Sequence, residues 1–165
     1  MVLFTDGFTP GQRKKEDGAS RIGAVMFART SARPAQLTAV VTPELVVLWL
    51  PRATQICMNE LLALVIALAT FKEYVIGKYV LLLVDAEAVE GALLKGYSSK
   101  EDMCELVGLF WDLALELRCS IYIDRIPTDA NCADKPSRDQ VGVGEALNWV
   151  AVPPIWPKRV INRTC

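Results

Sequence analysis

Residues 79–85 read YVLLLVD and decide the fold. The apolar run has the length of a strand and holds no polar interruption, which is typical of a strand covered on both faces of a sheet. Strands of that kind occur in α/β proteins, where crossover helices pack on both sides of the sheet. The run stops at Asp85, so we expect a carboxylate at the carboxyl end of a buried strand.

The sequence predicts one long helix before this strand and two helices after it. Residues 55–73 are apolar nearly all round, broken only by the Asn-Glu pair at 59–60 near the start, which indicates a buried helix. Residues 86–94 predict a short helix, and residues 103–117 carry the i, i+3, i+4, i+7 stripe of an amphipathic helix. A further strand is predicted over 119–126.

Strands also fill the first part of the chain. Residues 2–4 open an apolar run that stops at Asp6, and residues 21–29 and 37–41 are rich in apolar and β-forming residues. Together they predict a three-stranded meander. Residues 42–44 (TPE) predict a helix start with a proline at the first helical position, and this short helix would continue over 45–50 and end before Pro51, although a strand fits that stretch nearly as well.

These elements, with a last helix that starts within 134–140, predict one α/β domain. Its mixed five-stranded sheet combines a three-stranded antiparallel meander with parallel strands and is flanked by helices. The 165 residues suit a single compact domain with a hydrophobic core. We expect this domain over 1–150 and an irregular, proline-rich C-terminal tail over 151–165.

The composition excludes several kinds of active site. The chain has no histidine, which rules out Ser-His-Asp and Cys-His nucleophilic sites and histidine-ligated zinc. It carries 18 Lys+Arg against 19 Asp+Glu, a net charge of −1, which argues against a surface that is basic throughout. A local basic patch is compatible with that balance.

The cysteines and the hydropathy pattern bear on the compartment. The 5 cysteines are odd in number and form no Cys-x-x-Cys pair, so they indicate neither a disulfide framework nor a thiolate metal site. The longest apolar run, residues 61–71, is too short to cross a bilayer, and no leader with an apolar h-region precedes the first strand. We expect an intracellular protein of a reducing compartment, the cytoplasm or the nucleus, with no membrane partner.

Three acids interrupt apolar segments, where carboxylates are ordinarily rare. Asp6 ends the first apolar run, Glu60 lies at the start of the most hydrophobic helix, and Asp85 ends the most hydrophobic strand. Taken singly, each fits a cap or a chain-end acid better than a site. Taken together they fit a cluster outside the carboxyl ends of adjacent strands, where α/β proteins place their sites. A bound cation reduces the repulsion between the carboxylates of such a cluster. A site with oxygen ligands alone selects hard ions such as Mg²⁺ or Mn²⁺.

Four pieces of the sequence resemble the ribonuclease H family. They are LFTDG at 3–7, NELLA at 59–63, LVD at 83–85 and ANCAD at 130–134. Each piece alone is weak, but together they follow the family's order across most of the chain. The blocks 55–67, 96–99 and 125–138 look more like the ribonuclease H domains attached to the reverse transcriptases of retroelements.

The resemblance implies a single ribonuclease H-like domain with a defined activity. It would be an endonuclease that hydrolyses the RNA strand of RNA-DNA hybrids with two Mg²⁺ ions, for which Mn²⁺ can substitute, and without a protein nucleophile. The implied catalytic residues and metal ligands are Asp6, Glu60, Asp85 and Asp134. The residues expected at the substrate are Gly7, Gln55, Asn131 and Arg138. A reverse transcriptase domain in a parent polyprotein is a further implied partner.

The chain departs from the family in the loop before the last acid. Members commonly carry a histidine there, whereas this loop reads PTDA at 127–130, so we expect slower turnover or a substitute role for Asp129. The basic run at 13–15 fits a solvated loop better than a phosphate contact, and a grip on the nucleic acid would come from that run, Lys95, Lys100 or Arg138, or from a partner domain. Two alternatives remain open: a non-catalytic binding or tethering domain of the same fold, and a DNA-acting nuclease of the integrase or transposase type.

Overall fold

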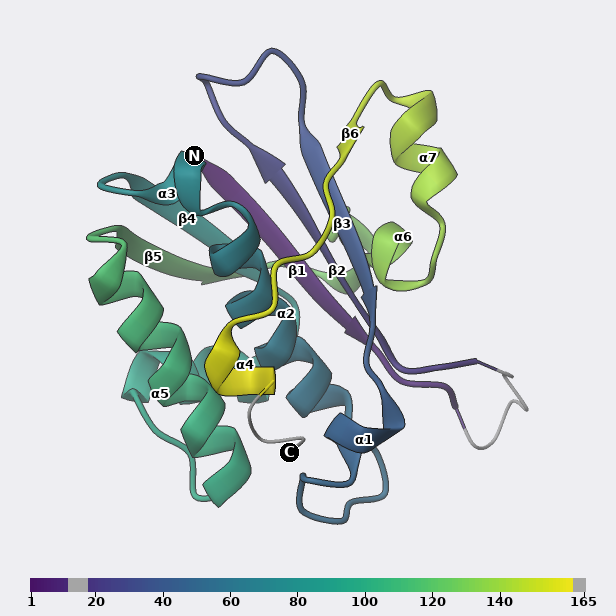
Figure 1. Ribbon diagram of the computed structural model, residues 1–165, viewed down its shortest axis with the longest axis vertical. Helices are drawn as coiled ribbons and strands as arrows, with labels where there is room; N and C mark the ends of the chain where they lie inside the picture. The colour runs from purple at the N-terminus through teal and green to yellow at the C-terminus, as the bar shows by residue number, and fades with distance from the viewer. Residues whose placement is uncertain (12–17, 162–165) are drawn as a thin grey trace.

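The computed structural model describes residues 1–11 and 18–161, and within them a six-stranded mixed sheet forms the centre of the protein (Figure 1). The strand order is β5-β4-β1-β2-β3-β6. The strands are β1 (Val2–Phe8), β2 (Arg21–Phe27), β3 (Ala35–Val40), β4 (Tyr79–Val84), β5 (Ser120–Arg125) and β6 (Val150–Ala151). The first three pair antiparallel, whereas β4 joins β1 and β5 joins β4 in parallel. The predicted α/β arrangement, a meander followed by parallel strands, is therefore confirmed.

The predicted count of five strands was one too low. The sixth strand is β6, which runs parallel to β3 at the edge of the sheet and was expected to be irregular. Val150 N donates to Pro34 O and Val152 N donates to Gln36 O, both at 2.8 Å. The pairing is complete before the chain reaches its prolines, and an edge strand needs backbone hydrogen bonds on one side only.

Helices cover both faces of this sheet. They are α1 (Pro43–Val46), α2 (Ile56–Thr70), α3 (Lys72–Val75), α4 (Glu87–Lys95), α5 (Glu101–Glu116), α6 (Asp134–Ser137), α7 (Val141–Ala146) and α8 (Lys158–Ile161), with a 3₁₀ turn, η1 (Thr128–Ala130). A Cβ on Gly7 of β1 would meet α2, whereas a Cβ on Gly23 of β2 would meet α6. Gly23 pairs with Asp6, the neighbour of Gly7, and successive residues of a strand point to opposite faces. Helices α2 and α6 therefore lie on opposite faces of the sheet.

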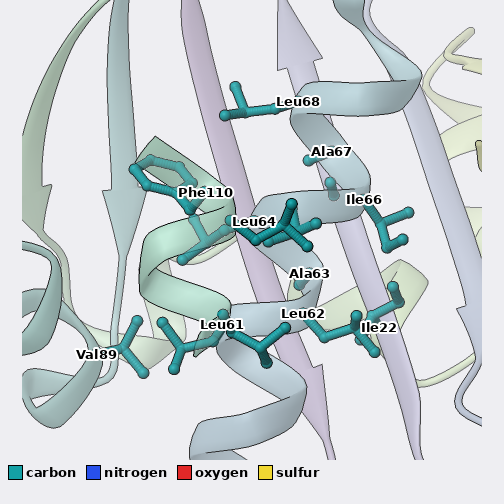
Figure 2. Packing of buried hydrophobic residues seen from close by; sticks show 14 of the residues in the cluster. Ile22, Leu61, Leu62, Ala63, Leu64, Ile66, Ala67, Leu68, Val89 and Phe110 are labelled. Atoms are coloured by element: carbon teal, nitrogen blue, oxygen red, sulfur yellow. The ribbon is translucent and has the colours of Figure 1, made fainter. Parts of the chain in front are cut away.

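The core is centred on α2, as the unbroken apolar pattern predicts. Every side chain from residue 58 to residue 70 is buried, so the helix is enclosed all round rather than lying on the surface. Figure 2 shows the cluster members around it, including Ile22 from β2, Val89 from α4 and Phe110 from α5. Each fully buried leucine in such a cluster contributes about 2 kcal/mol of transfer free energy.

The segment after β6 returns to this same core. Ile155 N donates to Thr70 Oγ1 at 2.9 Å, which ties the segment to the end of α2. Beyond it, Val160 of α8 is buried in the main cluster and Arg159 pairs with Asp112 of α5 at 2.6 Å. Figure 1 shows α8 in front of the helical layer, in yellow. Residues beyond 150 therefore complete the hydrophobic core.

No helix among the described residues has both the length and the apolar character that crossing a bilayer requires.

Val160→Ala is expected to lower the free energy of unfolding by about 1 to 2 kcal/mol, because it leaves a cavity in the core. Urea denaturation monitored by circular dichroism measures the loss. The matched control is Arg159→Ala, which removes an exposed ion pair and is expected to change stability by less than about 0.5 kcal/mol. Equal losses in the two variants would contradict the placement of α8 in the core.

Candidate metal centre

The site opens where β1 and β4 stop pairing. Their parallel ladder joins residues 2–4 to residues 81–83, and β4 ends at Val84, whereas β1 continues alongside β2 as far as Phe8. Asp6 therefore lies on a part of β1 that has lost its partner on one side. Asp85, the first residue after β4, lies at the same end of the sheet. The predicted convergence of these two acids follows from this order of strands.

The absence of a side chain at Gly7 brings α2 onto β1 at this point. A Cβ there would lie 2.5 Å from Glu60 N and 2.6 Å from the carbonyl carbon of Asn59, closer than real atoms approach. Only glycine lets the first turn of α2 rest directly on the strand. Gly7 was predicted to be a substrate residue, and the structure places it in the wall of the site as the spacer that brings Glu60 beside Asp6.

Three of the four predicted ligands form a tight group. One carboxylate oxygen each from Asp6, Glu60 and Asp85 lies within 4.8 Å of the others. The first two side chains are only 5% and 4% exposed. Among the described residues, buried Glu60 Oε2 and Asp85 Oδ1 have no hydrogen-bond partner. Buried, unpartnered carboxylate oxygens at this spacing suit a hard divalent cation such as Mg²⁺ or Mn²⁺.

Burial shifts the titration of this group. It raises the pKa of Asp6 from 3.8 to about 7, with the nearby carboxylates of Asp85 and Asp134 adding to the rise and the Ser137 hydroxyl opposing it. Burial likewise raises the pKa of Glu60 from 4.5 to about 9, again with help from the neighbouring acids. Without a cation, protons therefore stay on Glu60 and, in part, on Asp6 at neutral pH. A bound metal would displace them.

Asp134, the fourth predicted ligand, lies at the rim of the same site. It lines the pocket of about 260 Å³ that the other three acids line, but its carboxylate does not belong to their group. Its Oδ1 accepts a hydrogen bond from Arg138 Nε at 2.6 Å, and Lys135 Nζ lies 3.9 Å from Oδ2. The structure thus brings three acids together and holds the fourth beside them in an ion pair.

Two asparagines fix the backbone of β1 on either side of Asp6. Asn131 is buried, and its Nδ2 donates to Thr5 O at 2.9 Å while its Oδ1 accepts from Ala133 N at 3.1 Å. Asn59 Nδ2 donates to Phe8 O at 2.9 Å. Asn131 was predicted to contact substrate, whereas here both ends of its amide are bound within the protein. Its position makes it the tie between the loop before α6 and β1.

Gln55 lies outside the pocket of the acids. Its Nε2 donates to Leu50 O at 3.0 Å and its Oε1 accepts from Arg52 Nη1 at 3.1 Å. Arg52 in turn makes a two-point ion pair with Asp102 of α5, one contact being 2.7 Å from Nη1 to Oδ2. This network anchors the connection between α1 and α2, and no local pattern in the sequence predicts it. Gln55 lines a separate pocket of about 570 Å³.

The loop that lacks the histidine contributes a different residue from the one expected. Thr128 of η1 lines the pocket of the acids, whereas Asp129 is exposed and is not part of the lining. The basic run at 13–15 lies outside the described residues.

A second close approach positions Asp134. A Cβ on Gly23 of β2 would overlap the backbone of Ser137 and lie 2.8 Å from Ala133 O, so α6 rests directly on the strand at this glycine. Because Gly23 pairs with Asp6, the contact sets the start of α6 against the site. Nothing in the sequence around Gly23 distinguishes it from a glycine that merely weakens a strand.

Gly23→Ala is expected to destabilise the protein by about 2 kcal/mol, because the added methyl group forces α6 away from β2. Gly91 provides the control: it lies inside α4 with open space around it, so Gly91→Ala should be neutral or stabilise by about 0.5 to 1 kcal/mol. Thermal denaturation of both variants measures the difference. If Gly23→Ala is as stable as the wild type, α6 does not rest on β2 as described.

The metal-free protein is expected to lose stability as the pH rises. Folding raises the pKa of Glu60 from 4.5 to about 9, so the folded state binds more protons than the unfolded state between these values, and the free energy of unfolding falls across that window. Glu60→Gln should flatten the fall by about 2 kcal/mol. Urea titrations in EDTA between about pH 5 and about pH 9 test this.

The matched control for that titration is Glu73→Gln, which changes an exposed glutamate on α3 and should leave the pH profile as it is in the wild type. A Glu60→Gln profile as steep as that of the wild type would show that Glu60 does not titrate in this window.

No protein-family model matches the sequence, and no curated protein matches it either. Solved structures do match the fold. The crystal structure of RNase H1 from the halophilic archaeon Halobacterium salinarum aligns with a TM-score of 0.61 at 18% identity, covering 86% of this chain and 97% of that chain. The N-terminal RNase H domain of a Mycobacterium tuberculosis protein aligns with a TM-score of 0.59 at 18% identity, covering 89% and 96%.

A third match is LC11-RNase H1, a protein isolated from compost by a metagenomic approach, in complex with an RNA/DNA hybrid. Its TM-score is 0.61 at 18% identity, and the alignment covers 88% of this chain and 98% of that chain. The mixed sheet, the flanking helices and nearly the whole length of these structures are shared. The chain therefore has the RNase H-like fold.

Proposed function

We propose that this protein is a ribonuclease H, an endonuclease that hydrolyses the RNA strand of RNA-DNA hybrids with divalent cations. The observation that carries the proposal is the tight group formed by buried Asp6 and Glu60 with half-buried Asp85, at the point where β1 and β4 separate. A hard cation is the partner that this group lacks, with Mg²⁺ as the expected ion and Mn²⁺ as its substitute.

The acids of the site would act as metal ligands, and other side chains of the pocket would contact the substrate. Asp6, Glu60 and Asp85 would hold one cation, and Asp134 with Asp6 would hold a second. When bound, two such ions activate the attacking water and stabilise the departing oxygen of a phosphodiester. Thr128 and Arg138 line the same pocket and offer a hydroxyl and a guanidinium to a phosphate. No side chain needs to act as a nucleophile, which suits a chain without histidine.

The hybrid as substrate rests on the shared fold. One of the matching structures is an RNase H1 in complex with an RNA/DNA hybrid, and the alignment covers 88% of this chain. The site is open at the ends of β1 and β4, so a strand of nucleic acid is able to reach it from outside. A duplex that carries 2′-hydroxyls on one strand only is distinguished from DNA by those groups.

Two finer proposals rest on the sequence alone. The blocks at 55–67 and 125–138 support an origin in a retroelement and a reverse transcriptase domain as partner. The cysteine pattern supports a reducing compartment inside the cell, and the cysteines that the structure describes are free.

One observation favours a second candidate, a non-catalytic binding domain. Asp134 is paired with Arg138 and its carboxylate lies outside the tight group of the other three acids, so the site with four acids is incomplete as it stands. A DNA-acting nuclease of the same fold would use the same carboxylates. Substrate choice and metal dependence separate the three possibilities.

Cleavage of a labelled RNA-DNA hybrid tests the proposal directly. With Mg²⁺ or Mn²⁺ the wild-type protein should release shortened RNA with 3′-hydroxyl ends, and Asp6→Asn or Asp85→Asn should slow the reaction by a factor of about 100 or more. Asp112→Asn, an exposed acid on α5, is the matched control and should retain activity. Circular dichroism checks that each variant is folded.

The alternative candidates predict different products in that assay. Cleavage of duplex DNA but not of the hybrid would support the DNA-acting nuclease. Hybrid binding without cleavage in either metal would support the binding domain and overturn the proposed activity.

A further inference from the structure

The ion pair between Asp134 and Arg138 lies inside the proposed catalytic pocket. Both residues line the same pocket as Asp6, Glu60 and Asp85. The contact is a charge-assisted hydrogen bond of 2.6 Å from Nε to Oδ1, and only 20% of the Asp134 side chain is exposed. The Asp134 carboxylate, which would complete the site, is therefore already paired with the positively charged guanidinium of Arg138.

Arg138 is itself held in place by β1. Its guanidinium carbon lies 5.0 Å from the centre of the Phe8 ring, a distance at which a cation is attracted to the face of an aromatic ring. Phe8 is the last residue of β1, two positions after Asp6. An arginine stays charged at any working pH, so this pairing does not depend on titration.

We propose that Arg138 is a positioning residue that sets the order in which the two cations bind. This inference rests on the proposed function. The first cation binds to Asp6, Glu60 and Asp85, whose oxygens already lie within 4.8 Å of one another. The second cation needs Asp134 and must compete with the Arg138 guanidinium for its carboxylate. The second site is therefore the weaker one.

The release of Arg138 has a use in the reaction. Once the second cation takes Asp134, the guanidinium is freed from that carboxylate within a pocket that admits a phosphate. The two parallel N–H donors of a guanidinium match the oxygens of a phosphate group. The negatively charged phosphate of an arriving substrate could therefore take the place of the Asp134 carboxylate. Substrate and second cation would therefore favour each other's binding. A phosphate that pairs with Arg138 leaves the Asp134 carboxylate open to the cation, and a cation on Asp134 leaves the guanidinium open to the phosphate.

Lys135 provides a matched control for this proposal. It also carries a positive charge beside Asp134, with Nζ 3.9 Å from Oδ2, but it is half exposed and does not line the pocket. Arg138→Gln and Lys135→Gln each remove one positive charge beside the Asp134 carboxylate. Only the removal of Arg138 frees the carboxylate oxygen that it holds.

Mn²⁺ binding to the protein without substrate tests the proposal, by calorimetry and by electron paramagnetic resonance of the free ion. The wild type should bind one ion tightly and a second more weakly. Arg138→Gln should strengthen the second step about three- to tenfold and change the first by less than about twofold. Lys135→Gln should change both steps by less than about twofold. Asp134→Asn should remove the second step in the wild-type and in the Arg138→Gln background.

Arg138→Lys adds a variant that keeps the charge but not the fork of donors, so its second step should lie between those of the wild type and Arg138→Gln. An unchanged or weaker second step in Arg138→Gln, or an equal gain in both steps, would overturn the role of Arg138 while leaving the metal centre intact. No Mn²⁺ binding at all by the wild type would overturn the metal centre, and with it the proposed function.

Discussion

The enclosure of α2 is the constraint on which the rest of this structure depends. Its apolar side chains point in every direction, so the helix is stable only when the sheet, α4 and α5 pack around it. Gly7 permits the closest contact, where the first turn of the helix meets β1. The same enclosure carries Glu60 into the interior, because the acid belongs to the helix that the core must bury.

That burial explains why the acids need a partner. A carboxylate taken out of water beside two others is unfavourable when charged, and protons or a cation must compensate for it. The hydrophobic core supplies the free energy that keeps Glu60 in the interior despite this cost. The candidate metal centre is thus assembled by packing rather than by attraction between its carboxylates, which repel one another when charged.

Sequence patterns revealed the parts of the fold that depend on local periodicity. The strand at 79–84 was predicted at its observed bounds because its run is continuous, and α2 was recognised because its buried residues are uninterrupted. β6 was missed because it has only two residues and pairs with a strand more than a hundred positions away. The networks of Asn131 and Arg52 were missed for the same reason, since their partners are remote in sequence.

In the candidate site, too, the features that depend on local sequence patterns were predicted, and those that depend on remote partners were missed. Asp6, Glu60 and Asp85 were found because a carboxylate inside an apolar segment is conspicuous, and the structure brings them together. The pairing of Asp134 with Arg138 is a local contact four residues apart, whereas the tie made by Asn131 and the spacing function of Gly23 depend on which remote segments meet. No periodicity in the chain encodes those meetings.

The return of α8 to the core also bears on when the hydrophobic core is completed during synthesis of the chain. The acids of the site lie at positions 6, 60, 85 and 134, and the core closes with Val160. Contacts between the two ends of a chain form only after both ends have left the ribosome. The entropy cost of closing the long loop between them must be met before those contacts stabilise the fold. A nascent chain that stops short of α8 already contains all four acids but lacks the Val160 side chain that completes the core. The hydrophobic core is therefore completed only after the last of the four acids has been synthesised.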